Sequence, residues 1–234
     1  VGGKTGVDLP QGKNLVGAFK QPALVAVDPD TLKSLPSDEF RSGLAEVVKA
    51  GMIGDPFLFA AMEGRRGEET SPSPASAPSP KSVDTPPLQL ADLIGRAVRV
   101  KVEVVQEDPF EQGRRAVLNL GHTYGHAFET LSGYRLRHGE AVSIGLVAAT
   151  RLATRLELCE PDLVERVETL LGRLGLPIRA YGFAPPQVLA AMGADKKRIG
   201  NRLRFVLPRA IGDVDVFDDV PDQAVLAVLT ELTA

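Results

Sequence analysis

The sequence predicts a mostly helical chain with one small β-hairpin near its C-terminus. Several long stretches repeat apolar side chains at the three- to four-residue spacing of an amphipathic helix, with turn signals between them. Near the C-terminus, "RLRFVL" and "DVDVF" flank the turn-forming "PRAIG", which predicts a hairpin. The start differs, because glycine-rich "VGGKTG" and the β-branched run "ALVAV", residues 23–27, predict a turn and then a buried strand.

The helical elements follow in order after that strand. Ser37 is expected to cap a helix that contains "GLAEVVKAG", with Asp38 and Glu39 in its first turn. A segment rich in Pro and Ser, at about 64–87, is too poor in apolar side chains to pack and predicts a disordered insertion. The remaining helical patterns are Leu88–Glu107, Arg114–Leu131, Gly139–Leu158, Pro161–Leu174 and Pro221–Leu232.

The composition indicates a globular chain without a general affinity for polyanions. A length of 234 residues with 44% hydrophobic content suffices for a substantial core in one large or two small domains. The formal net charge of -3 argues against nucleic acid or an anionic membrane as the main partner. The single cysteine, Cys159, cannot form an intramolecular disulfide, and no apolar run is long enough for a membrane span. We therefore expect a cytoplasmic protein.

Two of the three histidines lie four residues apart in "LNLGHTYGHAFE", residues 118–129. On one helix they share a face with other polar side chains, and the nearby glycines indicate that this helix is buried on several sides. The polar residues on this predicted face are Arg115, Asn119, His122, His126 and Glu129.

The spacing of His122 and His126 resembles that of zinc peptidases, but Thr123 occupies the position where those enzymes need a glutamate. A catalytic zinc usually takes three protein ligands, and His138 and Glu46 are the candidates for a third. The residues alone leave three interpretations open: a metal pair, a ligand beside an acid-base group, or packing.

Lysines recur beside small or helical residues and together can form a clamp for phosphate and carboxylate groups. "GGKTG" also matches the end of a nucleotide P-loop, but only weakly, because the earlier glycine and strand of that motif are not in the sequence. The lysines concerned are Lys4, Lys13, Lys49, Lys101, Lys196 and Lys197.

Five motifs in order closely resemble the 3-dehydroquinate synthase family of sugar phosphate cyclases. They are "VGGKTGVDLPQGKNLVGAFKQP", "FRSGLAEVVKAGMI", "LNLGHTYGHAFE", "LRHGEAVSIGL" and "ADKK". The resemblance implies a lyase of the shikimate pathway that uses NAD and Zn²⁺, or Co²⁺. Its substrate would be 3-deoxy-D-arabino-heptulosonate 7-phosphate, converted to 3-dehydroquinate and phosphate by transient oxidation, elimination, re-reduction and aldol closure.

The resemblance also implies roles for single residues. Glu46, His122 and His138 match metal ligands that also contact substrate, whereas His126 matches an acid-base residue and Glu111 a proton acceptor. Lys13 and Thr31 match cofactor-binding positions. Substrate-binding positions are matched by Lys4, Asn14, Lys49, Lys101, Arg115, Asn119 and one of Lys196 and Lys197, with Lys49 and Lys101 also implied in catalysis.

The chain departs from the family at its start, because the family has a nucleotide-binding α/β domain before "GGKTG". Residues 1–35 would then be the tail of that domain, and residues 36–234 the helical metal- and substrate-binding domain. We expect this chain alone to bind NAD poorly and to turn over slowly or not at all, and the family implies a homodimer.

Two alternatives remain. In the first, the chain is a sister cyclase that acts on sedoheptulose 7-phosphate; Asn119 and the lysine pair of "DKK" argue against this alternative. In the second, the chain is a noncatalytic remnant that serves as a binding module.

Overall fold

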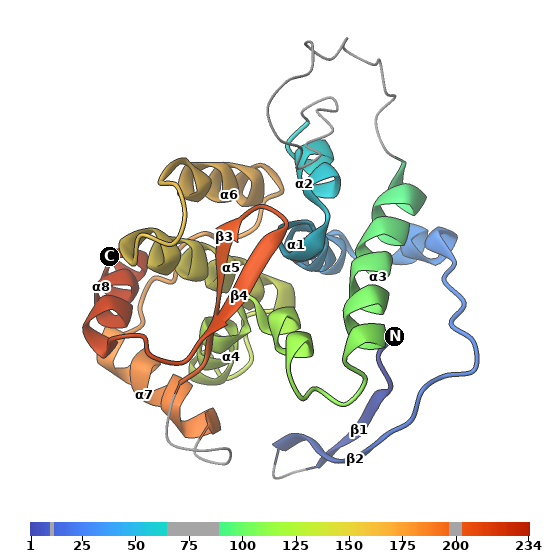
Figure 1. The fold of residues 1–234 in the computed structure, drawn as a ribbon, viewed down its shortest axis with the longest axis horizontal. Coiled ribbons are helices and arrows are strands. Elements are labelled where there is room, and N and C mark those ends of the chain that lie inside the picture. Colours follow the sequence, from blue (N-terminus) through green and yellow to red (C-terminus); the bar gives the residue numbers. More distant parts are fainter. Residues whose placement is uncertain (10–11, 65–88, 197–202) are drawn as a thin grey trace.

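The computed structural model describes residues 1–9, 12–64, 89–196 and 203–234, and within them the fold is mostly helical with two small hairpins (Figure 1). The elements in chain order are β1 Lys4–Leu9, β2 Gly12–Phe19, the 3-10 helix η1 Pro29–Ser34, α1 Ser37–Gly54, α2 Pro56–Met62, α3 Leu90–Glu107, the 3-10 helix η2 Arg114–Asn119, α4 His122–Leu131, α5 His138–Arg155, α6 Asp162–Arg173, α7 Pro185–Lys196, β3 Phe205–Ala210, β4 Asp213–Phe217 and α8 Asp222–Thr233.

Helix α5 forms the centre of the core. Its residues from Gly139 to Ala153 are almost all buried, and α1, α4, α6, α8 and β3 pack around it (Figure 1). A helix that is apolar on every side is stable only when it is enclosed, and the run "AVSIGLVAA" in α5 has that character. This central helix also begins at His138, so one predicted site residue stands at the end of the most buried element.

The predicted C-terminal hairpin is confirmed. Strands β3 and β4 pair antiparallel from Phe205 opposite Phe217, and the first four residues of β3 are buried against the core. The predicted long helices are also found, with ends shifted by up to three residues, as α3, α5, α6 and α8.

The N-terminal region contains a hairpin that the sequence analysis did not predict. Strands β1 and β2 pair antiparallel, with Lys4 opposite Phe19, in the segment expected to be a glycine-rich turn. Their apolar side chains lie largely in solvent, and Val7 and Val16 are each 58% exposed.

The predicted buried strand at residues 23–27 is wrong. This segment forms no strand, and Leu24 is 83% exposed. A strand needs hydrogen-bonding neighbours, and in the described part of the chain β1 and β2 pair only with each other. The composition of residues 23–27 therefore indicated a preference for strand, but none of the described strands pairs with this segment.

The single helix predicted from Arg114 to Leu131 is also wrong, because the chain breaks between η2 and α4. Gly121 has a φ of +76° at this break. A Cβ atom at Gly121 would lie 3.0 Å from the backbone nitrogen of Leu146 in α5, so the glycine permits both the turn and the close approach. Arg115 and Asn119 thus do not share a helix with His122.

The start of α1 and several short elements also differ from the prediction. Ser37 is the first residue of α1 and makes no capping hydrogen bond, since Pro36 occupies the N-cap position. Helices α2 and α7 were not predicted. The Pro/Ser-rich insertion predicted at about 64–87 lies outside the described residues, except for Gly64.

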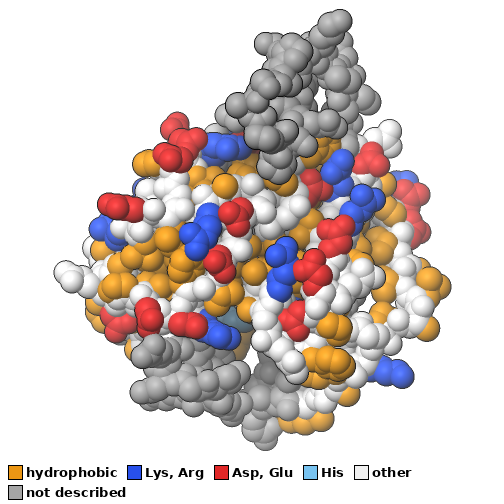
Figure 2. Space-filling view, viewed as in Figure 1, with side chains coloured by type: hydrophobic (Ala, Val, Ile, Leu, Met, Phe, Trp, Pro, Cys, Tyr) orange, Lys and Arg blue, Asp and Glu red, His pale blue; other side chains and the backbone are white. Residues whose placement is uncertain are grey.

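The molecular surface mixes both signs of charge. On the face drawn in Figure 2, acidic and basic side chains alternate, with apolar side chains exposed between them. Within the described ranges, none of the helices combines the length and the hydropathy needed to cross a bilayer.

Candidate functional site

A cavity of about 670 Å³ lies between α1, α3, η2, the N-terminal ends of α4 and α5, and the first residues of the chain. It brings together most of the residues that the sequence analysis selected. The carboxylate and histidines at one end are Glu46, His122 and His138, and the basic side chains are Lys4, Lys49, Lys101 and Arg115. Glu111 and Asn119 also line this cavity.

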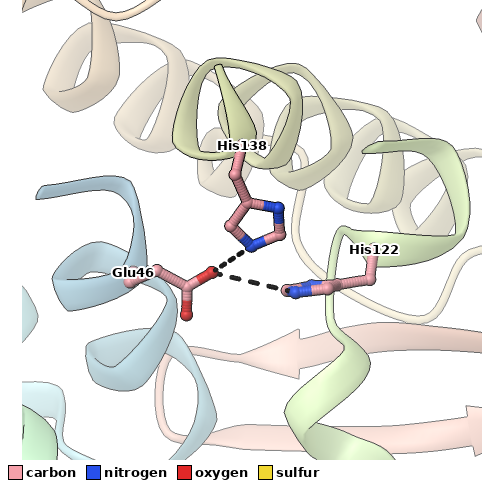
Figure 3. A group of neighbouring side chains, drawn as sticks. All are labelled: Glu46, His122 and His138. Carbon is pink, nitrogen blue, oxygen red and sulfur yellow. Dashed lines mark ion pairs between the residues drawn. The ribbon is translucent and has the colours of Figure 1, made fainter. Parts of the chain in front are cut away.

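Three elements each contribute one potential metal ligand (Figure 3). Oε1 of Glu46, in α1, lies 3.4 Å from Nε2 of His138 and 3.8 Å from Nε2 of His122. One ligand atom from each residue lies within 4.8 Å of the others. Ligands at zinc-like bond lengths in a tetrahedral site are separated by roughly 3.3 Å, so the three atoms are close to the spacing that an ion requires.

Close backbone contacts hold these three residues together. A Cβ atom at Gly139 would lie 1.8 Å from the carbonyl oxygen of Ser42, and the Gly139 amide donates to Ser42 Oγ at 3.0 Å. This contact fixes the start of α5, and thus His138, against the turn of α1 that precedes Glu46. Gly125 brings α4 against α5 in the same manner.

The Glu46 carboxylate has two distinct environments. Its Oε2 accepts from Lys49 Nζ at 2.6 Å, whereas Oε1 is buried and has no hydrogen-bond partner among the described residues. A buried oxygen without a partner is costly in water-free surroundings. Its position between two imidazole nitrogens therefore fits a bound cation.

The pKa shifts agree with a cluster that can hold a cation. Burial lowers the pKa of His122 to about 3, with help from the charge of Lys49, so this imidazole is neutral at pH 7. Glu46 raises the pKa of His138. Burial alone would raise the pKa of Glu46, but His138, Lys49 and His122 hold it well below its usual value. Glu46 is therefore ionised, as a carboxylate ligand must be.

Lys49 is a buried cation that lines the cavity. It is 8% exposed, and burial lowers its pKa although Glu46 opposes the shift. Lys101 lies close enough to lower that pKa further. Two ammonium groups facing one cavity favour an anionic ligand between them.

A loop before η2 places two further residues. Asp108 accepts hydrogen bonds from the backbone amides of Gln112, Gly113 and Arg115 at 2.8 to 3.0 Å. Within this loop Glu111 has a φ of +60°, which is uncommon for a residue with a side chain, and its carboxylate pairs with Lys4. Asp108 was missed by the sequence analysis, although an aspartate before Pro109 is a turn signal.

Arg115 is buried and links the N-terminus to this loop. Its guanidinium donates to the carbonyl oxygens of Pro109, at 2.7 Å, and Gly2, at 2.5 Å. Since a guanidinium has five N–H donors, others are available to a ligand in the cavity that Arg115 lines.

His126 lies beside the cluster and is exposed. Its ring centroid is 5.3 Å from that of His122, but His126 is not part of the cavity lining. Thr31 also lies outside the lining, and its hydroxyl donates to the carbonyl of Asp28 at 2.7 Å. The roles assigned to both residues stay predictions.

Four predicted residues are not placed. Lys13 and Asn14 lie on β2 and Lys196 ends α7, but their side chains are outside the described part of the chain. Lys197 lies wholly outside the described residues.

Glu129 is a buried carboxylate that received no functional role from the sequence. Its Oε1 lies 3.4 Å from Nδ1 of His138. The sequence placed Glu129 on the polar face of the predicted helix. Its pairing with His138 could not be predicted, because it depends on how α4 packs against the start of α5.

The chain is similar to curated enzymes over nearly its whole length. It is 46% identical to the 3-dehydroquinate synthase of Xanthomonas campestris over 238 aligned positions, which cover 99% of this chain and 61% of the relative. The identity to the 3-dehydroquinate synthase of a Synechococcus strain is also 46%, with 98% and 60% covered. The chain therefore spans about three-fifths of the length of these relatives.

Two solved synthase structures share the fold. A 2-epi-5-epi-valiolone synthase from Streptomyces hygroscopicus, with NAD⁺ and Zn²⁺ bound, superposes with a TM-score of 0.81 at 27% identity and covers 99% of this chain and 61% of its own. A 2-deoxy-scyllo-inosose synthase complexed with carbaglucose-6-phosphate, NAD⁺ and Co²⁺ superposes with a TM-score of 0.74 at 24% identity, covering 98% of this chain and 62% of its own. The fold class predicted from the sequence is thus confirmed.

Two family profiles match consecutive parts of the chain. The profile described as 3-dehydroquinate synthase N-terminal matches residues 1–42, and the one described as 3-dehydroquinate synthase C-terminal matches residues 43–198. Together they leave only the C-terminal hairpin and α8 unmatched among the described elements. The chain belongs to the 3-dehydroquinate synthase family.

Proposed function

We propose that this chain forms the metal- and substrate-binding part of a 3-dehydroquinate synthase. The reaction is conversion of a phosphorylated seven-carbon keto sugar acid, 3-deoxy-D-arabino-heptulosonate 7-phosphate, to 3-dehydroquinate and phosphate. The observation that carries the proposal is the cavity in which Glu46, His122 and His138 face four basic side chains. A phosphorylated sugar acid has two anionic ends and several hydroxyls, and this cavity offers a complementary group for each.

The residues present fit a divalent metal. Glu46 Oε1 lacks a hydrogen-bond partner among the described residues, and two imidazole Nε2 atoms lie 3.4 and 3.8 Å from it. Zn²⁺ or Co²⁺ held by Glu46, His122 and His138 would polarise an alcohol or ketone oxygen of the substrate.

Basic residues then hold the two anionic groups. Lys49 and Lys101 face the cavity from α1 and α3, and Lys4 faces it from β1. Arg115 offers planar N–H donors that suit a carboxylate or phosphate. Binding both ends of an open-chain sugar acid fixes its reacting carbons, which lowers the entropic cost of ring closure.

Proton transfer is assigned to His126 and Glu111. An imidazole can donate or accept a proton in general acid-base catalysis, and a carboxylate at the cavity wall can accept one. Glu111 pairs with Lys4 in the structure, so a substrate phosphate or carboxylate that attracts Lys4 would release Glu111 to act as a base.

NAD is the proposed acceptor and donor of hydride, on the basis of the NAD⁺ present in the two related cyclases. Of the two predicted cofactor-binding residues, Thr31 donates its hydroxyl hydrogen bond to the carbonyl of Asp28, and the side chain of Lys13 lies outside the described residues. The dimeric state and the cytoplasmic location expected from the sequence also remain predictions.

Phosphate release is the direct test. The 234-residue chain is incubated with NAD and Zn²⁺ and either the seven-carbon sugar acid phosphate or sedoheptulose 7-phosphate. A chimera that adds the unmatched part of the Xanthomonas relative is assayed in parallel. We expect release only from the acid sugar, slow or absent with the chain alone and restored in the chimera. No release by a folded, metal-loaded chimera supports the noncatalytic interpretation instead.

The sister-cyclase alternative has one structural argument, the TM-score of 0.81 to a valiolone synthase. The identity of 27% to that protein is well below the 46% to dehydroquinate synthases. Release of phosphate from sedoheptulose 7-phosphate, but not from the acid sugar, would reassign the substrate while retaining the family.

The division of roles between histidines has its own test. His138→Ala should remove bound zinc, because it deletes one of three ligands, whereas His126→Ala should retain zinc and lose turnover in the chimera. Zinc is measured by atomic emission after desalting. Equal zinc loss in both variants would contradict the division.

A further inference from the structure

Glu129 is a buried carboxylate directly behind the proposed metal ligands. Its side chain, in the last turns of α4, is 11% exposed. Oε1 lies 3.4 Å from Nδ1 of His138, and no lysine or arginine pairs with the carboxylate among the described residues. A buried charge needs a partner, and here that partner is an imidazole.

The His138 ring lies between two carboxylates. Nδ1 faces Glu129, and Nε2 faces Oε1 of Glu46 at 3.4 Å. A carboxylate behind Nδ1 favours the proton on that nitrogen, which leaves the lone pair on Nε2 for a ligand in the cavity. Glu129 is therefore placed to influence both the tautomer and the orientation of the ring.

His122 shows the same arrangement with a different acceptor. Its Nδ1 lies 3.1 Å from the carbonyl oxygen of Leu120, which can only accept, and its Nε2 faces Glu46. Both histidines thus present Nε2 to one carboxylate oxygen while a protein acceptor holds Nδ1. The acceptor of His122 is neutral backbone, whereas that of His138 carries a charge and can make its imidazole a stronger electron donor.

His138 has the greater need of such support. Its side chain is 48% exposed, against 14% for His122, so packing restrains its ring less. In known metal sites, loss of a carboxylate that holds a ligand imidazole lowers metal affinity by about 10- to 100-fold.

We propose that Glu129 is a positioning residue that orients His138 and fixes Nε2 as its metal-binding nitrogen. The inference rests on the proposed function, because it assumes that His138 binds a metal. Glu129 is neither one of the three proposed ligands nor part of the cavity lining.

The test measures zinc affinity of the purified 234-residue chain by competition with a chromophoric chelator, after the native metal has been stripped. Glu129→Ala removes the acceptor, and we expect about 10- to 100-fold weaker binding. Glu129→Gln retains an acceptor oxygen without charge, and its affinity should lie between those of Glu129→Ala and the unmodified chain. The absorption bands of bound Co²⁺ should broaden or shift in Glu129→Ala, because the His138 ring is no longer fixed.

Glu63→Gln is the matched control. The Glu63 side chain is 9% exposed and pairs with Arg166 at 2.9 Å, so this change also neutralises a buried carboxylate, but away from the histidines. Its zinc affinity should equal that of the unmodified chain. Circular dichroism of each metal-free variant establishes that the fold is retained, and if Glu129→Ala does not fold, the nearly isosteric Glu129→Gln decides.

Zinc affinity within twofold of the unmodified chain in folded Glu129→Ala, or in Glu129→Gln where only that variant folds, would overturn the inference. An equal loss in Glu63→Gln would also overturn it. These results leave the proposed function intact if His138→Ala still abolishes zinc binding. If the unmodified chain and His138→Ala bind zinc equally, the metal site itself is wrong, and the inference fails with it.

Discussion

The cluster of Glu46, His122 and His138 and the β1–β2 hairpin contribute to the same cavity, but the chain holds them differently. The cluster lies where α1, α4 and α5 meet through glycine contacts and buried apolar side chains. The hairpin exposes its apolar residues. It reaches the rest of the chain through two polar links, Arg115 to Gly2 and Lys4 to Glu111, and through the aromatic pair of Phe19 and Phe110. The geometry of the proposed metal site is therefore built into the helical core, whereas the position of the hairpin beside the cavity depends on a few contacts.

The largest effect should come from filling the contact between α4 and α5. A Cβ atom at Gly145 would lie 1.9 Å from the carbonyl oxygen of Gly121, and neither backbone can move without displacing the core. Gly145→Ala should lower the free energy of unfolding by about 3 kcal/mol, measured by urea denaturation, and should weaken zinc binding. Gly172→Ala is the same change in α6, where a Cβ would meet nothing within 4 Å, and should stabilise by about 0.5–1 kcal/mol. Similar effects at both positions would show that the glycine contact does not hold the cluster.

The second largest effect is expected in the pH dependence of protonation of His122 and His138 in the metal-free chain. Because burial lowers the pKa of His122 to about 3, this residue should stay neutral at pH 4, whereas His138, whose pKa is raised by Glu46, should protonate above pH 6.5. Imidazole ¹⁵N signals recorded from pH 8 to pH 4 measure both titrations. Protonation of both residues near pH 6.5 would mean that the cluster is more open to water than the structure shows.

The two shifts have opposite consequences for stability. Below pH 6.5, unfolding allows His122 to take up a proton, so its contribution destabilises the fold increasingly as the pH falls toward 3. His138 is stabilising while protonated, and that contribution disappears as the pH rises through its raised pKa. His122→Asn should therefore reduce the loss of stability between pH 6.5 and pH 4, measured by urea denaturation at each pH.

The sequence predicted the helical part well because its helices bury an apolar stripe of regular period. It did not predict the break at Gly121, since the φ of that glycine is imposed by the approach of α5. The strand expected at residues 23–27 failed for the converse reason, as strand formation depends on a neighbour that composition cannot reveal.

The same distinction applies to the site. The sequence motifs selected His122, Glu46 and His138 as candidate ligands, and the structure brings these three residues into one cluster. Asp108 and Glu129 were given no role, because each acts through a hydrogen bond whose partner is positioned by tertiary packing or loop conformation. Residues that support others are hidden from a single sequence for this physical reason.

A smaller effect is expected from the first link to the hairpin. Arg115→Ala removes the donors to the carbonyl oxygens of Gly2 and Pro109, and loss of one such buried charged bond costs about 1–3 kcal/mol. We expect the amides of β1 and β2 to exchange with deuterium about tenfold or more faster, with little change in α4 and α5. Arg114→Ala, which removes only a surface pair with Glu107, is the control. Unchanged exchange in the hairpin would show that Arg115 does not anchor it.

The smallest effect should come from the second link, the ion pair of Lys4 and Glu111. These side chains are 50% and 30% exposed, and such partly solvated pairs contribute about 0–1 kcal/mol. Glu111→Gln should change the free energy of unfolding by less than about 1 kcal/mol, and 1 M NaCl should remove the difference, because salt screens exposed charges. Lys33→Ala breaks the still more exposed pair with Asp30 and should change nothing measurable. A larger, salt-resistant effect of Glu111→Gln would mean that the pair fixes the strained Glu111 backbone and that the hairpin is as firmly built as the helical cluster.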